Sequence, residues 1–200
     1  MTGIVDELKR QSKITDMMIT MYSIQKVKYY NMSLFVDIVL IISSAILTIF
    51  IYFDYNLLKE LGINVDYAKT TINVSSILTF LMSLISLVVD WKGKSEKNDQ
   101  ACNQLSRLKD EYRVILSEPT KLTQTTLKEQ TDKYNQLFSM LPKIPNKLFN
   151  KLKLKHKKKV ELSKLIDKYP GANIWVLRIK LSYIFNKKVI TNDILDGKTN

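Results

Sequence analysis

The stretch SSILTFLMSLISLVVDWKGK, residues 75–94, decides which class of protein this chain belongs to. It continues a segment, Thr70–Val89, that holds 20 residues without one charged side chain. A helix rises about 1.5 Å per residue, so a helix of this length crosses a hydrocarbon core of about 30 Å. The segment ends in Asp90, Trp91 and Lys92, residue types typical of the boundary between lipid and water. The stretch therefore predicts a membrane span.

A second apolar segment, Leu34–Phe53, comes earlier in the chain. It also has 20 residues and carries one charge, Asp37, within a turn of its start. Only 16 residues, 54–69, separate the two segments. Soluble helices normally present a charged face to water, and neither segment has one. We predict two spans that form an α-helical hairpin in the bilayer; the alternative is a soluble pair of unusually apolar helices.

The distribution of charge predicts the orientation of the spans. The net charge is +12, and residues 90–200 carry 24 Lys and Arg against 12 Asp and Glu. Basic segments next to a span tend to remain in the cytoplasm. Both termini are therefore expected in the cytoplasm, and the link 54–69 on the opposite side of the membrane.

The composition argues against an enzyme. Cys102 and His156 are the only residues of their types, whereas metal sites and acid–base catalysis depend heavily on histidine. The five glycines do not have a phosphate-binding spacing. We therefore predict no catalytic residues, no metal site and no cofactor.

The remaining segments favour an all-α membrane protein. Its predicted parts are an N-terminal amphipathic cytosolic helix (1–33), the transmembrane hairpin (34–89), a basic cytosolic helical region (90–190) and a tail (191–200). The N-terminal helix is expected to continue into the first span. Its apolar stripe has spacings of three and four and consists of Ile14, Met17, Met18, Met21, Ile24 and Val27.

Two paired helices are predicted after the second span. The first runs from about Lys94 to Ser117 with a heptad seam of Ala101, Leu105, Leu108, Tyr112 and Ile115. Pro119 ends it, because proline disfavours helix in the residue before it. A partner helix over about 121–141 should turn inward Leu127, Tyr134, Leu137, Phe138 and Leu141. A later helix should end at Tyr169, before Pro170.

Each span carries one polar stripe. At about 100° per residue, each stripe falls within an arc of about 60–80°. The candidate residues are Asp37, Ser44 and Thr48, with Ser33, in the first span, and Ser76, Thr79, Ser83, Ser86 and Asp90 in the second. Small hydroxyl residues are common where spans pack together. The alternative is the lumen of a pore built from several hairpins, which an ionisable Asp37 favours.

A polybasic run occupies residues 151–159. Its candidate contacts for anionic lipid are Lys151, Lys153, Lys155, Lys157, Lys158 and Lys159. Lysine binds lipid headgroups and nucleic acid backbones by charge, but without arginine or aromatic residues it does not predict base readout. In a chain with membrane spans, lipid contact or plain solvation is favoured, and nucleic acid is not expected.

The last apolar segment, residues 173–188, is too short to span a bilayer. Ile174, Leu177, Leu181 and Ile184 share one helix face, while Trp175, Tyr183 and nearby basic residues suit the headgroup level. Two interpretations remain open: a helix lying on the membrane surface, and a core helix that packs on the cytosolic region.

The order of these parts resembles that of a known group of families. The parts are a helix before two closely spaced spans, followed by NDQACNQLSRLKDEYRVIL, KEQTDKYNQLFSMLPKIP and FNKLKLKHKKKVELSKLIDKYPG. Over about residues 5–190 this is similar to the SLATT families of bacterial two-transmembrane effectors, which are associated with nucleotidyltransferases and nucleotide-sensor domains. The resemblance rests on organisation and brings no active site.

The SLATT resemblance implies a function in the bacterial inner membrane. It implies a homo-oligomeric, multi-pass effector of antiviral defence, which forms a pore or disrupts the membrane. Growth arrest or death would follow when a separately encoded sensor or second-messenger enzyme is triggered. The alternative is a membrane anchor that forms no pore and carries a basic helical module for binding protein or nucleic acid.

Overall fold

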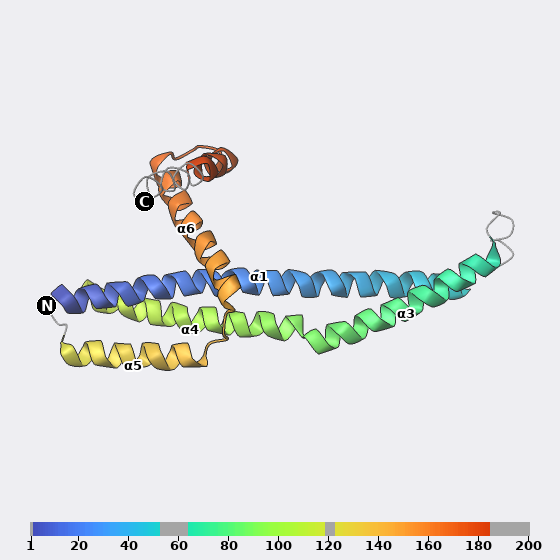
Figure 1. Cartoon of the computed structure of the whole chain (residues 1–200), viewed down its shortest axis with the longest axis horizontal. Coiled ribbons are helices and arrows are strands. Elements are labelled where there is room, and N and C mark those ends of the chain that lie inside the picture. Colours follow the sequence, from blue (N-terminus) through green and yellow to red (C-terminus); the bar gives the residue numbers. More distant parts are fainter. Residues whose placement is uncertain (1, 53–63, 119–122, 185–200) are drawn as a thin grey trace, which may run out of the picture. The chain divides into compact units, whose positions relative to one another are not determined.

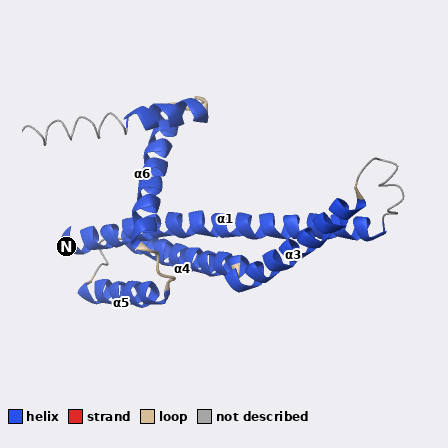
Figure 2. Ribbon diagram, turned by 45° about the vertical axis from the view of Figure 1, so that its right-hand side comes forward, coloured by secondary structure: helices blue, strands red, loops and turns tan. Residues whose placement is uncertain are grey.

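The computed structural model describes residues 2–52, 64–118 and 123–184, and every regular element in these ranges is a helix (Figures 1 and 2). The helices are α1 (Thr2–Tyr52), α3 (Val65–Val89), α4 (Trp91–Ser117), α5 (Gln124–Met140), α6 (Asn146–Lys168) and a last helix over 174–184. The chain forms two compact units, Met1–Pro142 and Lys143–Asn200. The all-α class is as predicted, while most of the link 54–69 and the tail 191–200 lie outside the described residues.

Helix α1 contains both the predicted N-terminal helix and the described part of the first apolar segment, residues 34–52. It runs for 51 residues without a break. No glycine or proline occurs between Gly3 and Tyr52, so nothing in the sequence interrupts the backbone hydrogen bonds of the helix. The predicted N-terminal helix therefore continues without interruption into the first apolar segment, which begins at Leu34.

Helices α3 and α4 are separated by a single residue, Asp90. Its backbone is left-handed, with φ 46° and ψ 59°, and its N–H donates to the Ser86 carbonyl at 3.2 Å. Its carboxylate then accepts from the N–H of Gly93 at 2.9 Å and so caps α4. A side chain at Gly93 would overlap this carboxylate. Helix α4 therefore begins at Trp91, earlier than the predicted Lys94, and the chain bends at Asp90 (Figure 1).

Helices α1 and α4 run antiparallel and side by side (Figure 1). The seam, as we call their interface, is lined at alternating spacings of three and four, as in a coiled coil. Its buried residues are Leu8, Gln11, Thr15, Met18, Tyr22 and Gln25 on α1, and Asn98, Ala101, Leu105, Leu108 and Tyr112 on α4. The α4 seam is close to the predicted one. The α1 stripe differs, because polar residues occupy half of the seam and Val27 is 53% exposed.

Helix α5 covers the end of the seam farthest from the spans. Leu8, Leu108 and Tyr112 form a buried cluster there. The half-buried side chains packed on it from α5 are Leu127, Tyr134 and Leu137. Phe138 stacks on Tyr134 with a ring-centroid separation of 4.2 Å. These α5 residues are among those predicted to face inward, although α5 begins at Gln124 rather than near 121.

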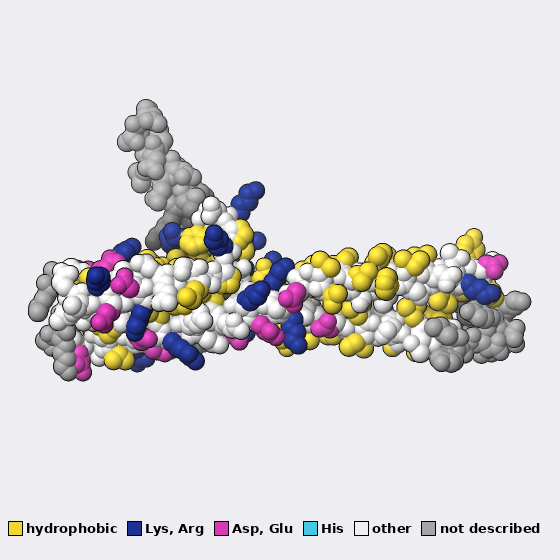
Figure 3. All heavy atoms as spheres, turned by 90° about the horizontal axis from the view of Figure 1, so that it is seen from below, with side chains coloured by type: hydrophobic (Ala, Val, Ile, Leu, Met, Phe, Trp, Pro, Cys, Tyr) yellow, Lys and Arg dark blue, Asp and Glu magenta, His cyan; other side chains and the backbone are white. Residues whose placement is uncertain are grey.

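The apolar parts of α1 and α3 are exposed rather than buried. In the most apolar stretch of α1, 6% of the residues are buried. In the most apolar stretch of the helix that begins at Val65, none is buried. On the face drawn in Figure 3, hydrophobic side chains spread over this half of the unit, while charged side chains gather over the seam. A core helix of a soluble protein would be mostly buried. The structure thus has two helices long and apolar enough to cross a membrane.

The second unit contains α6 and the helix over 174–184. Helix α6 ends at Lys168, capped by Tyr169, and the turn through Gly171 uses a φ of 95°, a conformation that glycine adopts easily. This confirms the predicted stop at Pro170. Leu177 and Leu181 are buried in the last helix.

Candidate functional site

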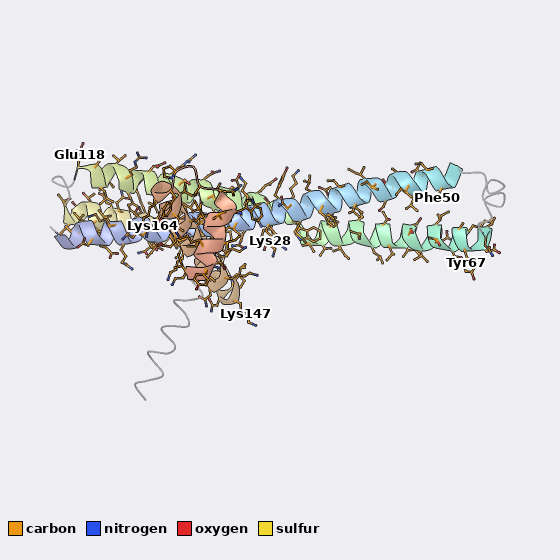
Figure 4. The ribbon with its side chains drawn as sticks, turned by 90° about the horizontal axis from the view of Figure 1, so that it is seen from above. Lys28, Phe50, Tyr67, Glu118, Lys147 and Lys164 are labelled. Carbon is orange, nitrogen blue, oxygen red and sulfur yellow. The ribbon has the colours of Figure 1, made fainter. Side chains whose placement is uncertain are left out.

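The candidate site residues of the spans lie on α1 and α3, which run side by side (Figure 4). Phe50 and Tyr67 line the same cavity of about 450 Å³ at the ends of these helices nearest the link. Ser43 contributes to this cavity from α1, and Ser75 and Thr79 from α3. The face of α1 nearest α3 therefore carries Ser43 and not the predicted Ser44.

The predicted stripes are divided between contact with the neighbouring helix and exposure. On α3, Thr79 and Ser86 are half-buried, whereas Ser76 and Ser83 are exposed. On α1, Asp37, Ser44 and Thr48 are all exposed. Ser83, Ser86 and Asp90 line a cavity of about 400 Å³ to which α1 contributes Leu40. One chain therefore does not bring the two stripes together around a common space.

Three of the stripe hydroxyls donate to backbone carbonyls of their own helices. Ser44 donates to the Ile41 carbonyl at 2.9 Å, Thr48 to the Ser44 carbonyl at 2.8 Å, and Thr79 to the Ser75 carbonyl at 2.9 Å. Such bonds satisfy a hydroxyl donor in a lipid environment without a second helix. The oxygen atoms keep acceptor capacity, so both packing and pore lining remain open for these residues.

Asp37 lies beside a cavity of about 330 Å³ where the spans meet the seam. The Ser33 hydroxyl donates to its carboxylate at 3.4 Å. The full lining is Lys26, Tyr30, Ser33, Leu34, Asp37, Lys92, Ser95, Glu96 and Asp99. Lys26 donates to Asp99 at 2.6 Å, which raises the pKa of the Lys26 ammonium group. The cavity therefore combines charges of both signs at the predicted boundary of the membrane.

Gln11 is the polar seam residue that contacts both neighbouring helices, α4 and α5. Its Oε1 accepts from the Tyr112 hydroxyl of α4 at 3.1 Å. Its Nε2 lies 3.1 Å from both Thr131 Oγ1 of α5 and Glu7 Oε1 of α1. One side chain therefore connects three helices. The sequence analysis missed Gln11, although the alternating spacing runs through it once polar residues are allowed in the seam.

Further polar contacts join α1 to α4 and to the connector that follows α5. The Tyr22 hydroxyl donates to the Pro142 carbonyl at 2.8 Å, and burial raises the pKa of Tyr22 to about 12. The Cys102 thiol lies 3.6 Å from the Ile19 carbonyl, and burial raises its pKa as well. Lys109 of α4 pairs with Asp16 of α1. The two helices are thus held in a single register by side-chain contacts and not by apolar packing alone.

Within residues 143–184, the part of the second unit that the structure describes, every Lys and Arg side chain is exposed. Each of the six predicted lysines between Lys151 and Lys159 is exposed. They point to more than one side of α6, because Lys151 and Lys153 lie about 160° apart on the helix. In the last helix the Arg178 guanidinium lies 5.9 Å from the Trp175 ring centroid, and the Lys180 ammonium lies 4.8 Å from that of Tyr169.

Within residues 2–52, 64–118 and 123–184, no group of three or more His, Cys, Asp or Glu side chains could hold a metal ion. No family model matches the chain, and neither the curated proteins nor the solved structures give a significant match.

Proposed function

We propose that this chain is a membrane effector whose copies assemble and permeabilise the bacterial inner membrane. The observation that carries the proposal is the continuity of α1. One helix of 51 residues contains both the seam partner of α4 and an exposed apolar half. Because no break separates the two halves, any change in the seam also changes the orientation of the span.

In the proposed arrangement, α1 and α3 cross the bilayer as a hairpin. The seam, α5 and the basic second unit lie in the cytoplasm, as the excess of Lys and Arg after residue 90 favours. Asp37 and Asp90 then lie near the cytoplasmic end of the spans. The exposed apolar side chains of α1 and α3 contact lipid in this arrangement. In water the same side chains would remain unfavourably solvated.

Assembly is required because two spans cannot enclose water. Asp37, Ser44 and Thr48 remain exposed on α1 after α3 has packed. Polar groups in a span normally face another helix or water, so this side of α1 is the proposed contact with neighbouring copies. It either lines the lumen or packs the subunits together.

The trigger is proposed from the SLATT resemblance. A separately encoded sensor or second-messenger enzyme would detect infection and act on the cytoplasmic helices. Growth arrest or death of the infected cell then limits spread of the virus.

A membrane-potential dye in bacteria that express the chain with its triggered partner tests the proposal. The expected result is rapid depolarisation in cells with the native chain. The variant with Ser44→Leu and Thr48→Leu separates two roles of these residues. If they line the lumen, the variant should form intact oligomers with little ion flux. If they pack the subunits together, the variant should lose its oligomers. Ile49→Leu is the matched control, because Ile49 is an exposed apolar residue of the same helix. Unchanged potential in cells with the native chain would refute permeabilisation.

The second candidate is a membrane anchor that forms no pore, which the six exposed lysines of α6 favour. Here the spans only hold a basic module that binds protein or nucleic acid. Replacing 34–53 and 70–89 with unrelated spans of equal length separates the two functions. Full cellular activity of that chimera would support the anchor and contradict the pore.

A further inference from the structure

The helix over 174–184 has two apolar faces, and only one of them is covered. Leu177 and Leu181 are 4% and 7% exposed. On the other side lie large apolar residues with most of their surface accessible. These are Trp175 at 71%, Val176 at 60%, Ile179 at 69% and Tyr183 at 68% exposed. The face that the sequence analysis identified thus has Leu177 and Leu181 buried and Ile174 50% exposed, and a second apolar face is accessible.

Basic residues flank the exposed face on both sides. At about 100° per residue, Trp175, Val176, Ile179 and Tyr183 lie within an arc of about 100°. Arg178 lies about 60° beyond one edge of this arc, and Lys180 about 40° beyond the other. An apolar face with aromatic residues and bordering cations is the pattern of a helix that lies in a membrane interface. The long stems of Arg and Lys let their charged ends reach the headgroups.

Two further observations favour a lipid surface as the occupant of this face. The same unit exposes the six lysines of residues 151–159, so its charge is complementary to anionic headgroups. The chain also carries two helices able to cross a bilayer. Attachment to these helices keeps the second unit close to the membrane, which gives it a high effective concentration there. A short helix with weak intrinsic affinity can therefore bind the surface.

We propose that the helix over 174–184 lies in the plane of the membrane surface, with Trp175, Val176, Ile179 and Tyr183 among the lipids and Arg178 and Lys180 on anionic headgroups. The second unit is thereby a lipid-sensing module. The proposal goes beyond the pore, because surface binding needs no ion flux and would also hold for a simple anchor.

Tryptophan quenching in the full-length chain tests the proposal. The chain has two tryptophans, so Trp91→Phe leaves Trp175 as the single reporter. The protein is reconstituted in vesicles of phosphatidylcholine with brominated acyl chains, with or without phosphatidylglycerol. We expect quenched, blue-shifted emission of Trp175 in vesicles with phosphatidylglycerol and much weaker quenching without it. The complementary Trp175→Phe variant reports on Trp91, which should be quenched in both lipids because it directly follows a span.

Charge reversal separates lipid binding from other causes of quenching. The double variant Arg178→Glu and Lys180→Glu should lose most of the effect, since each basic residue at an anionic surface changes partitioning roughly fivefold. Lys13→Glu with Lys128→Glu is the matched control, because it changes the net charge equally at two exposed residues of the other unit. Ile179→Ser should also weaken quenching while the helical content stays unchanged.

Three outcomes would overturn the proposal. Equal quenching of Trp175 with and without phosphatidylglycerol would remove the role of anionic lipid. Blue-shifted emission without quenching would mean that protein, such as a second copy, covers the face. Emission at the wavelength of a solvated indole in both lipids would mean that the face remains in water.

Discussion

Single polar residues determine how helices α1, α4 and α5 are aligned. Gln11 is 3% exposed and binds Tyr112 and Thr131 from two other helices. A buried polar group costs free energy unless its hydrogen bonds are made, so other alignments of these helices would leave Gln11 and Tyr112 without partners. The apolar seam residues hold the helices together, and these polar residues select one register.

A double-mutant cycle tests the role of Gln11. Gln11→Leu should reduce the free energy of unfolding by about 2 kcal/mol, because the buried Tyr112 hydroxyl loses its acceptor. Tyr112→Phe should cost about 1 kcal/mol, and the double variant less than the sum, since no orphaned hydroxyl then remains. Unfolding in detergent micelles measures all three. Gln100→Leu on the exposed face of α4 serves as the control, and strict additivity would contradict the coupling.

The raised pKa of Cys102 predicts slow chemistry at its thiol. The thiolate is the reactive form, and burial next to α1 favours the neutral thiol. At mildly alkaline pH the native chain should therefore hold less thiolate than the unfolded chain and react more slowly with iodoacetamide. Its rate should keep rising at pH values where the unfolded chain has reached its plateau. Equal rates in the native and denatured chains would show that Cys102 is accessible and unperturbed.

At the scale of helices, Asp90 is the residue that divides one long helix into two. Asp90→Ala removes the cap of α4 and places a residue without a side-chain acceptor in a left-handed conformation. We expect a loss of about 2 kcal/mol in thermal unfolding experiments. Asp90→Asn keeps an acceptor and tolerates the conformation, so it should remain within about 0.5 kcal/mol of the native chain. Equal losses in the two variants would show that the negative charge, not the cap, matters.

Some of these elements could be predicted from the sequence and others could not. The spans and the α4 seam follow from long or regular apolar patterns such as Ala101, Leu105 and Leu108. The α1 seam was predicted only in part: Met18 belongs to the predicted stripe, but Gln11 and Thr15 are polar and no apolar stripe includes them. On the exposed face of the last helix, Trp175 and Tyr183 were singled out from the sequence, but Val176 and Ile179 were not. Both of its faces are apolar, so hydropathy alone does not distinguish the covered face from the free one.

The candidate site was harder to predict than the helices. The stripe containing Ser44 was recognised from spacing, but spacing does not say which side of a span meets its neighbour. In the structure that side carries Ser43 and Leu47. The left-handed backbone at Asp90 has no local signal either, because it depends on where two helices end and begin.

At the scale of the whole molecule, the orientation in the membrane is directly testable. Cys102→Ser supplies a chain without cysteine, into which single cysteines are placed at Lys13, Asp66 or Lys128. An impermeant maleimide added to intact cells should label only the cysteine at position 66, because the link is predicted to lie outside. The other two should react only after the membrane is permeabilised. Labelling at position 13 in intact cells would reverse the predicted orientation.

The apolar halves of α1 and α3 differ in how they join the seam, and this difference has a mechanical consequence. Helix α1 runs for 51 residues without a break from the seam into its apolar half, whereas α3 ends at Asp90, where α4 begins. A tilt of α1 by about 10° at the boundary would displace the far end of its 30 Å span by about 5 Å. Helix α3 is joined to α4 only through the non-helical residue Asp90, so no continuous helix forces it to follow this tilt. A torque on the part of α1 that packs on α4 would thus move the apolar ends of α1 and α3 apart.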